Sequence, residues 1–177
     1  GSIEPLGYSR FAQRLLTARP ELDAEFAAEG PWRADGMLAF LRAQPMETEP
    51  QLHAALRSLR QRVMLRLLAR DLSHQADLAE VCATTTALAE TAIGAALAWL
   101  EPRLEAEFGT PTTEVGERQR LIVVGMGKLG GGELNVSSDV DLLFVYPEEG
   151  ETRGGSADQE HGPRSLSNHE FFTRLGR

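Results

Sequence analysis

The segment 121–147, LIVVGMGKLGGGELNVSSDVDLLFVYP, restricts the possible fold of this chain more than any other. Two short apolar runs, 121–124 and 140–146, are typical of β-strands, because each is rich in Val, Leu, Ile or Phe and stops at Gly or Pro. A glycine-rich loop and the acidic motif Ser-Ser-Asp-Val-Asp lie between them. Beyond the glycine loop only residues 131–138 are available for a connection, fewer than the roughly ten that a crossover helix needs. The segment therefore does not predict a βαβ unit.

Two familiar nucleotide sites fit this segment poorly. Gly125, Gly127 and Gly130 match the spacing of the dinucleotide-binding fingerprint, but the crossover helix is missing. The ribose-binding acid of that fold lies at the far end of the second strand, whereas Asp139 and Asp141 lie at its beginning here. A P-loop would need glycine at position 122 and a hydroxyl at position 129, which are isoleucine and leucine.

Asp139 and Asp141 instead indicate a divalent-metal site. Residues i and i+2 of a strand point to one face, so both carboxylates can reach a common point. Neighbouring carboxylates repel each other, and a hard cation such as Mg²⁺ or Mn²⁺ relieves that repulsion. A solvated turn that happens to contain two aspartates is the alternative explanation.

The loop ahead of the two aspartates has the groups that phosphate binding requires. Glycines expose backbone N–H groups and allow phosphate oxygens to approach closely. The candidate phosphate-binding residues are Gly127, Lys128, Gly130, Gly131 and Ser138. Together with Asp139 and Asp141 they predict a metal-dependent nucleotidyltransferase site.

The composition changes near residue 115. Of 22 alanines, 21 precede that position, whereas 11 of 17 glycines follow it. We therefore expect an α+β chain that is mostly helical overall, with a helical region at 1–115 and a partial nucleotidyltransferase domain at 116–177. Residues 108–119 are predicted to be a linker, because they combine Gly, Pro, Thr and charges without an apolar period. The second domain is expected to be cut by the end of the chain.

Capping residues and apolar periods predict helices at 9–18, 20–30, 34–43, 48–72 and 75–100, with Pro102 ending or kinking the last of them. A short final helix follows Ser167 and Asn168. On the helix 48–72 one stripe is predicted to be buried: Leu52, Leu56, Leu59, Val63 and Leu67. A second set is expected to form a solvated face or, alternatively, a docking surface for an acidic partner: Arg57, Arg60, Arg62, Arg66 and Arg70.

Net charge, cysteine content and the length of apolar runs restrict the partners and the cellular compartment that we expect. The formal net charge of −8 argues against nucleic acid as a partner. The single cysteine, Cys82, cannot form an internal disulfide, so we expect a reducing, cytoplasmic environment and a small buried side chain. No uninterrupted apolar run approaches the roughly 18 residues of a membrane span, so we expect no membrane contact.

The stretch GMGKLGGGELNVSSDVDLLFVYP, residues 125–147, resembles the signature of the bacterial bifunctional glutamine synthetase adenylyltransferase/adenylyl-removing enzymes. Residues 150–155, 170–176 and the opening 9–22 are also similar to that family, so the resemblance covers almost the whole chain. Met126 and the sequence Glu-Leu-Asn at 133–135 resemble its N-terminal, adenylyl-removing domain. The resemblance implies a nucleotidyltransferase domain of the DNA polymerase β superfamily.

The resemblance also implies an activity. Phosphate would attack the adenylyl-tyrosine of glutamine synthetase and release ADP, thereby regulating nitrogen assimilation. Asp139 and Asp141 would hold the catalytic metals, Mg²⁺ or Mn²⁺, and the glycine loop would contact phosphate. Implied partners are glutamine synthetase, a PII-type signal protein, ATP or ADP, and phosphate. The superfamily's usual Gly-Gly or Gly-Ser pair, about ten residues before the acids, is not fully matched here.

The family's third catalytic carboxylate belongs to a later strand, in a segment that does not occur before Arg177. We therefore expect the chain by itself to bind metal weakly and to be feebly active or inactive. The alternative function is a helical interaction module that docks glutamine synthetase or a PII-type protein without catalysis.

Overall fold

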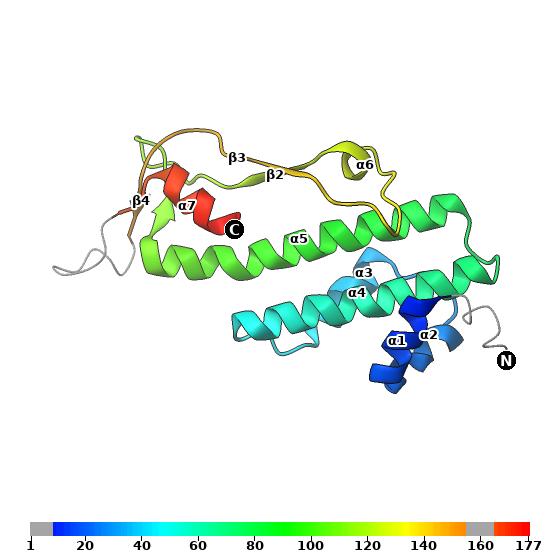
Figure 1. The fold of residues 1–177 in the computed structure, drawn as a ribbon. Helices are drawn as coiled ribbons and strands as arrows, with labels where there is room; N and C mark the ends of the chain where they lie inside the picture. The colour runs from blue at the N-terminus through cyan, green and yellow to red at the C-terminus, as the bar shows by residue number, and fades with distance from the viewer. Residues whose placement is uncertain (1–8, 155–164) are drawn as a thin grey trace. The chain divides into compact units, whose positions relative to one another are not determined.

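The computed structural model describes residues 9–154 and 165–177 (Figure 1). The first part of the chain is helical: α1 (Arg10–Ala18), the 3-10 helix η2 (Pro20–Asp23), α2 (Ala24–Ala27), α3 (Ala34–Arg42), α4 (Glu49–Leu72) and α5 (Leu78–Phe108). The later part holds β1 (Thr110–Pro111), β2 (Ile122–Gly125), α6 (Gly127–Gly130), β3 (Leu142–Val145), β4 (Thr152–Arg153) and α7 (Asn168–Leu175). The described residues are mainly helical with a few short strands, which is consistent with the predicted α+β class.

The chain divides into two compact units. Unit 1 contains the residues up to Ile93 and the segment Gly131–Asp139, and unit 2 contains Gly94–Gly130 and Val140–Arg177. The chain passes from one unit to the other inside α5 and again at each end of the segment 131–139. The predicted domain boundary near residue 115 was based on the change in composition and does not coincide with the boundaries of these two units. That domain division stays a prediction.

Local start signals place the helices of unit 1. The Ala12 N–H donates to Ser9 Oγ at 3.2 Å and so caps α1. The Thr48 N–H donates to Gln51 Oε1 at 3.0 Å, and Pro50 lies in the first turn of α4. The predictions for α1, α3 and α4 are confirmed to within one residue at each end.

One apolar cluster joins α1, η2 and α4 through the buried side chains of Ala12, Leu15, Leu22 and Leu65. The predicted stripe on α4 is buried except for Leu56, which is half-buried. Burial of the leucines in this cluster stabilises the packing of the short helices against α4 by about 1.5–3 kcal/mol for each side chain.

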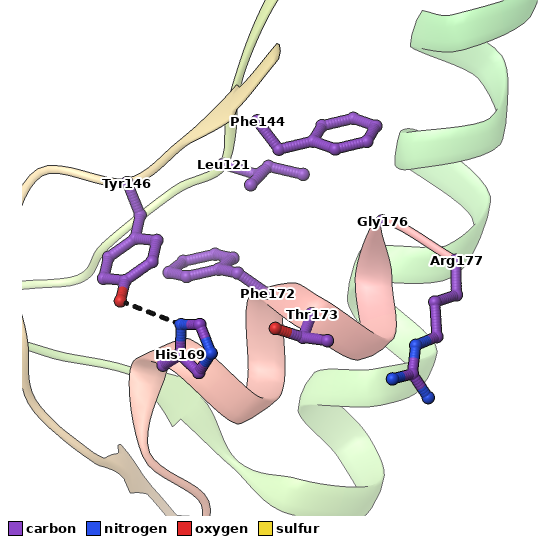
Figure 2. A pocket seen from close by; sticks show the side chains of 8 residues that line it. All are labelled: Leu121, Phe144, Tyr146, His169, Phe172, Thr173, Gly176 and Arg177. Atoms are coloured by element: carbon purple, nitrogen blue, oxygen red, sulfur yellow. Dashed lines mark hydrogen bonds between the residues drawn. The ribbon is translucent and has the colours of Figure 1, made fainter. Parts of the chain in front are cut away.

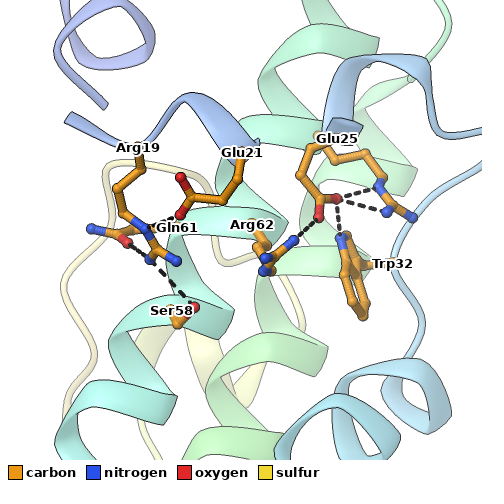
Figure 3. A network of polar contacts seen from close by, with 8 residues as sticks. Arg19, Glu21, Glu25, Trp32, Ser58, Gln61 and Arg62 are labelled. Carbon is orange, nitrogen blue, oxygen red and sulfur yellow. Dashed lines mark hydrogen bonds and ion pairs between the residues drawn. The ribbon is translucent and has the colours of Figure 1, made fainter. Parts of the chain in front are cut away.

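A buried carboxylate that the sequence analysis did not single out also joins α2 to α4 (Figure 3). Glu25 is only 4% exposed and accepts hydrogen bonds from Arg62 Nη1 at 2.8 Å and from Trp32 Nε1 at 3.1 Å. Arg66 donates to the same carboxylate through Nε at 2.9 Å and Nη2 at 2.6 Å. Two positive side chains and an indole therefore compensate the buried charge.

These bonds change the interpretation of the arginines on α4. Arg70 forms a two-point ion pair with Glu80 on α5, with N–O distances of 2.6 and 2.9 Å. The hydrogen bond to Glu80 raises the pKa of the Arg70 guanidinium above its usual value. Of the five arginines predicted to form a solvated face, only Arg57 and Arg60 are exposed. The solvated-face prediction is therefore wrong for Arg62, Arg66 and Arg70.

Pro102 was predicted to end or kink α5, and the first alternative is wrong, because this helix continues to Phe108. Proline lacks the N–H that would bond to the carbonyl four residues earlier, a loss of about 3 kcal/mol inside a helix. The Arg103 side chain donates to the Trp99 carbonyl at 2.8 Å and satisfies one acceptor near the proline. Leu104 and Phe108, beyond the proline, pack against the apolar cluster of unit 2. Tertiary packing thus stabilises the last turns of α5.

By length and composition α5 could cross a membrane. The sequence analysis expected no membrane contact, because it considered only uninterrupted apolar runs. An 18-residue window of this helix has a mean hydropathy of 1.4, and 28% of the window is buried. The window passes because alanines extend the shorter apolar runs and few charged residues interrupt them. The core helix of a protein that meets no membrane passes the same test, so a single such helix is weak evidence. Cys82, on the same helix, is half-buried rather than fully buried.

Unit 2 is built around α7. The Glu170 N–H donates to Ser167 Oγ at 3.2 Å, and the Glu170 carboxylate accepts from the Ser167 N–H at 3.2 Å, a capping box that confirms the predicted helix start. Phe171, Phe172 and Leu175 are buried from this helix. They pack with part-buried side chains that include Leu97 and Leu100 of α5.

The predicted linker 108–119 is an ordered part of unit 2. β1 pairs antiparallel with β4, and Thr113 is only 2% exposed. Asn168, fully buried at the start of α7, donates through Nδ2 to the carbonyls of Thr112 and Glu148, both at 3.0 Å. The linker interpretation is wrong because side-chain hydrogen bonds tie this segment to residues far away in the sequence: Asn168 bonds to the Thr112 carbonyl, and the Thr112 hydroxyl bonds to the Glu151 carbonyl.

Candidate functional site

Strands β2 and β3 form an antiparallel pair, which lies side by side in Figure 1. The register places Ile122 opposite Val145 and Gly125 opposite Leu142. The Met126 N–H continues the pairing by donating to the Asp141 carbonyl at 2.9 Å. A dinucleotide-binding unit requires these two strands to be parallel, so the antiparallel register excludes that alternative.

The glycine loop after β2 forms a single helical turn, α6, held by close contact. Gly127 has φ +55°, a backbone conformation that favours glycine. A Cβ atom on Gly130 would overlap the carbonyl oxygen of Gly125, so this position also requires glycine. Leu129 is 7% exposed, and its side chain lies against Gly125. Lys128 is exposed, and its ammonium has no partner among the residues that the structure describes.

The segment Gly131–Asp139 belongs to unit 1 and is held there by a buried hydrogen bond from a side chain to its backbone. Leu134 is 4% exposed, and its carbonyl accepts a hydrogen bond from the Thr85 hydroxyl of α5. Gly131 itself is exposed at the start of this segment. The acidic motif therefore follows an anchored residue.

Asn135 organises the turn that leads into the acidic motif. Its Oδ1 accepts from the Ser137 N–H at 3.1 Å, from the Ser137 hydroxyl at 3.1 Å and from the Ser138 hydroxyl at 2.7 Å. The Asn135 N–H donates to Ser138 Oγ at 3.2 Å. An asparagine that bonds to the backbone two residues later forms an Asx turn. The Ser138 hydroxyl, a predicted phosphate ligand, is thus already engaged by Asn135.

The two predicted catalytic aspartates fall in different units. Asp139 is the last residue of the unit 1 segment, and Asp141 lies just before β3 in unit 2. Both are exposed, and neither carboxylate has a hydrogen-bond or ion-pair partner in residues 9–154 and 165–177. Within those ranges no three His, Cys, Asp or Glu side chains gather as a metal site would require. The chain thus offers two free carboxylates, a donor set that suits a hard cation but does not surround it.

The comparison with known proteins places the chain in a family. The family model described as glutamate-ammonia ligase adenylyltransferase matches residues 4–177. The chain belongs to the glutamate-ammonia ligase adenylyltransferase family. This membership confirms the resemblance drawn from residues 125–147.

The relatives of this adenylyltransferase-family chain are considerably longer. It is 51% identical to the bifunctional glutamine synthetase adenylyltransferase/adenylyl-removing enzyme of Nitrosomonas europaea, over 97% of this chain and 18% of the relative. The protein of the same name from Burkholderia pseudomallei is 50% identical over 97% of this chain and 19% of its own length. The one from Pseudomonas putida is 45% identical over 91% of this chain. The chain thus spans about a fifth of the length of these relatives.

Unit 2 of this adenylyltransferase-family chain also contains an aromatic pocket of about 330 Å³ beside α7 (Figure 2). Tyr146 and Phe172 stack in its wall with ring centroids 5.1 Å apart. The Tyr146 hydroxyl donates to Glu149 Oε1 at 2.6 Å, and this bond raises the pKa of the Tyr146 phenol. Asp141 and Tyr146 lie at opposite ends of β3, roughly 16 Å apart along an extended chain. The lining of this pocket includes neither Asp139 nor Asp141.

Sequence reasoning missed one feature of the candidate site, the Asn135 turn, and one feature of the fold, the buried Glu25 carboxylate. The role of Asn135 was detectable, because Asn followed by Ser-Ser is typical of an Asx turn. The ion pairs of Glu25 were not detectable, because its arginine partners lie 37 and 41 residues away in the chain.

Proposed function

We propose that this chain carries the nucleotidyltransferase site with which its longer relatives remove AMP from glutamine synthetase. The observation that supports the proposal most is the order of parts in a member of this family: β2, the close-packed glycine turn α6, the Asx turn of Asn135, and two unpaired aspartates before β3. In the proposed reaction a phosphate oxygen bonds to the phosphorus of adenylyl-tyrosine, the bond from phosphorus to the tyrosine oxygen breaks, and ADP leaves. The tyrosinate then takes up a proton from water.

The two aspartates are the residues that would hold a divalent cation, Mg²⁺ or Mn²⁺. Only Val140 separates them, so their Cα atoms lie within about 7 Å of each other by chain geometry alone. When bound, the cation would supply positive charge for the phosphoryl oxygens and the leaving oxygen. Two carboxylates without a third make the binding weak, so we expect this chain alone to turn over slowly.

The other residues of the loop act by position and charge. Lys128 contributes an exposed positive charge on α6 that attracts phosphate. Gly127, Gly130 and Gly131 keep side chains away from the loop backbone, which lets phosphate oxygens approach it closely. The Gly130 N–H itself donates to the Met126 carbonyl at 3.3 Å. Ser138 and Asn135 hold the entry to the acidic motif in one conformation, so the aspartates need less reorganisation on binding.

The proposal is tested by Asp139→Asn with Asp141→Asn in a protein of the relatives' length that contains this chain. Phosphate-dependent release of ADP from adenylylated glutamine synthetase should fall by roughly 10³-fold, equivalent to about 4 kcal/mol of barrier. Glu133→Gln is the matched control, since Glu133 is an exposed carboxylate in the same segment. Both variants should retain the far-ultraviolet circular dichroism of the parent.

The alternative, a helical module that docks glutamine synthetase or a PII-type protein, gives the opposite result. In that case the double variant keeps its deadenylylation activity, because catalysis would reside elsewhere in the longer protein. On α4 the exposed arginines left for an acidic partner are Arg57 and Arg60.

A further inference from the structure

Unit 1 contains a second pocket, of about 370 Å³, between the entry to α3 and one face of α5. Residues four and seven apart on a helix share a face, and Glu80, Thr84 and Ala87 line the pocket in this way. The side chains of Ala83 and Ala87 are short, which leaves the hollow open. From the other side the pocket is closed by Pro31, Trp32, Arg33 and Ala34.

Thr84 provides an unused polar group in this pocket. The residue is only 5% exposed, and its hydroxyl has no hydrogen-bond partner among the residues that the structure describes. On the same helix the Thr85 hydroxyl lies within hydrogen-bond distance of two carbonyls, that of Val81 at 2.8 Å and that of Leu134. The Thr84 hydroxyl oxygen is not among the fully buried atoms that lack a partner, so it is open to the pocket and can bond to a molecule bound there.

The Arg33 end of the pocket carries positive charge. Arg33 is the N-cap residue of the nine-residue helix α3 and provides no side-chain cap, so the first N–H groups of α3 are left without one. Its guanidinium is exposed, and within residues 9–154 and 165–177 it forms no ion pair. The helix dipole adds partial positive charge at the same end. Asp35 is the acidic residue in the first turn of α3, and it does not line the pocket.

The other polar side chains at the pocket are already paired. The Glu80 carboxylate is held by Arg70 at 2.6 and 2.9 Å, which compensates its charge. The indole N–H of Trp32 donates to Glu25 at 3.1 Å, so Trp32 contributes only an apolar ring surface. The lining therefore combines one uncompensated cation, one free hydroxyl and apolar walls, the composition of a site for a small organic ligand.

We propose that this pocket binds a small organic anion. Its carboxylate contacts Arg33, the Thr84 hydroxyl and the N-terminus of α3, and its apolar body lies against Trp32 and Ala87. The pocket includes none of the residues assigned to phosphate transfer, so the proposal is independent of the proposed function. A volume of about 370 Å³ accommodates a ring-sized body as well as the carboxylate.

The experiment uses Trp99→Phe in the full chain, which leaves Trp32 as the single tryptophan. The chain is titrated with cyclohexanecarboxylate, with the neutral cyclohexanecarboxamide and with inorganic phosphate, and both Trp32 fluorescence and heat are recorded. We expect saturable binding of the carboxylate alone. Arg33→Gln and Thr84→Val should each weaken it about tenfold or more, since each removes a hydrogen bond to a charged group.

Arg57→Gln is the control, because Arg57 is an exposed arginine that does not line the pocket. Ala87→Leu, which fills the pocket and leaves the charges in place, should abolish binding. The proposal is overturned if the carboxylate does not bind, if it binds Arg33→Gln and Thr84→Val as tightly as the parent, or if phosphate or the carboxamide binds equally well. Circular dichroism confirms that each variant is folded.

Discussion

Loss of the buried carboxylate of Glu25 should weaken unit 1 by a measurable amount. Glu25 is 4% exposed, whereas the side chains of Arg62 and Arg66 retain 24% and 18% exposure. Removal of one partner of a buried ion pair costs about 3–5 kcal/mol, because the other charge is left without compensation. Water reaches the two guanidinium groups in part, so we expect about 3 kcal/mol for Glu25→Ala and about 2 kcal/mol for Glu25→Gln.

The assay is urea unfolding followed by Trp32 fluorescence in the Trp99→Phe background, since Trp32 contacts the Glu25 carboxylate directly. With a typical slope for a small protein, a loss of 2–3 kcal/mol lowers the midpoint by about 1–2 M urea. Glu21→Gln is the matched control: its carboxylate is 55% exposed and bonds to Arg19 alone at 2.8 Å, so the midpoint should not move (Figure 3). Equal midpoints for Glu25→Ala and Glu21→Gln would refute the reasoning.

Three further predictions concern glycine, proline and pH. Gly130→Ala should destabilise unit 2 by about 1–3 kcal/mol in chemical unfolding, because its methyl overlaps a backbone carbonyl of β2; Gly94→Ala on α5, where a Cβ meets nothing within 4 Å, should instead stabilise by about 0.5–1 kcal/mol. Pro102→Ala should raise the melting temperature of the chain by several degrees, since it restores a helical N–H; an unchanged or lower temperature would show that the proline costs α5 nothing. Hydrogen bonds from Ser167 hold the pKa of Glu170 below its usual 4.5, so this capping contribution is complete above pH 4.5 and is lost as the pH falls through the lowered pKa; Glu170→Gln should remove that acid-dependent part of the unfolding curve, and an unaltered pH dependence would count against the cap.

Features encoded by neighbouring residues could be predicted from the sequence. Ser9, Thr48 and Ser167 start helices because their caps need only residues three positions away. The strands around the glycine loop were also predicted, since Val and Leu runs bounded by Gly and Pro leave few alternatives.

Features that depend on distant partners could not be predicted. Pro102 remains helical because side chains beyond it join the core of unit 2, and the predicted linker is ordered because Asn168 bonds to Thr112 across 56 residues. The candidate site shows the same division. The order of glycines and aspartates follows from the sequence, whereas the engagement of Ser138 by Asn135 needed coordinates. The metal and phosphate roles of these residues stay predictions.

The most direct test of the proposed site is the binding of Mn²⁺ to the full chain, measured by calorimetry. The account predicts weak binding with one-step saturation, lost in Asp139→Asn with Asp141→Asn and retained in Glu133→Gln. The paired aspartates are the only carboxylates in the segment 131–141 besides Glu133, so the comparison isolates them. Equal Mn²⁺ binding by the double variant and by the parent chain would contradict the assignment of Asp139 and Asp141 as metal ligands.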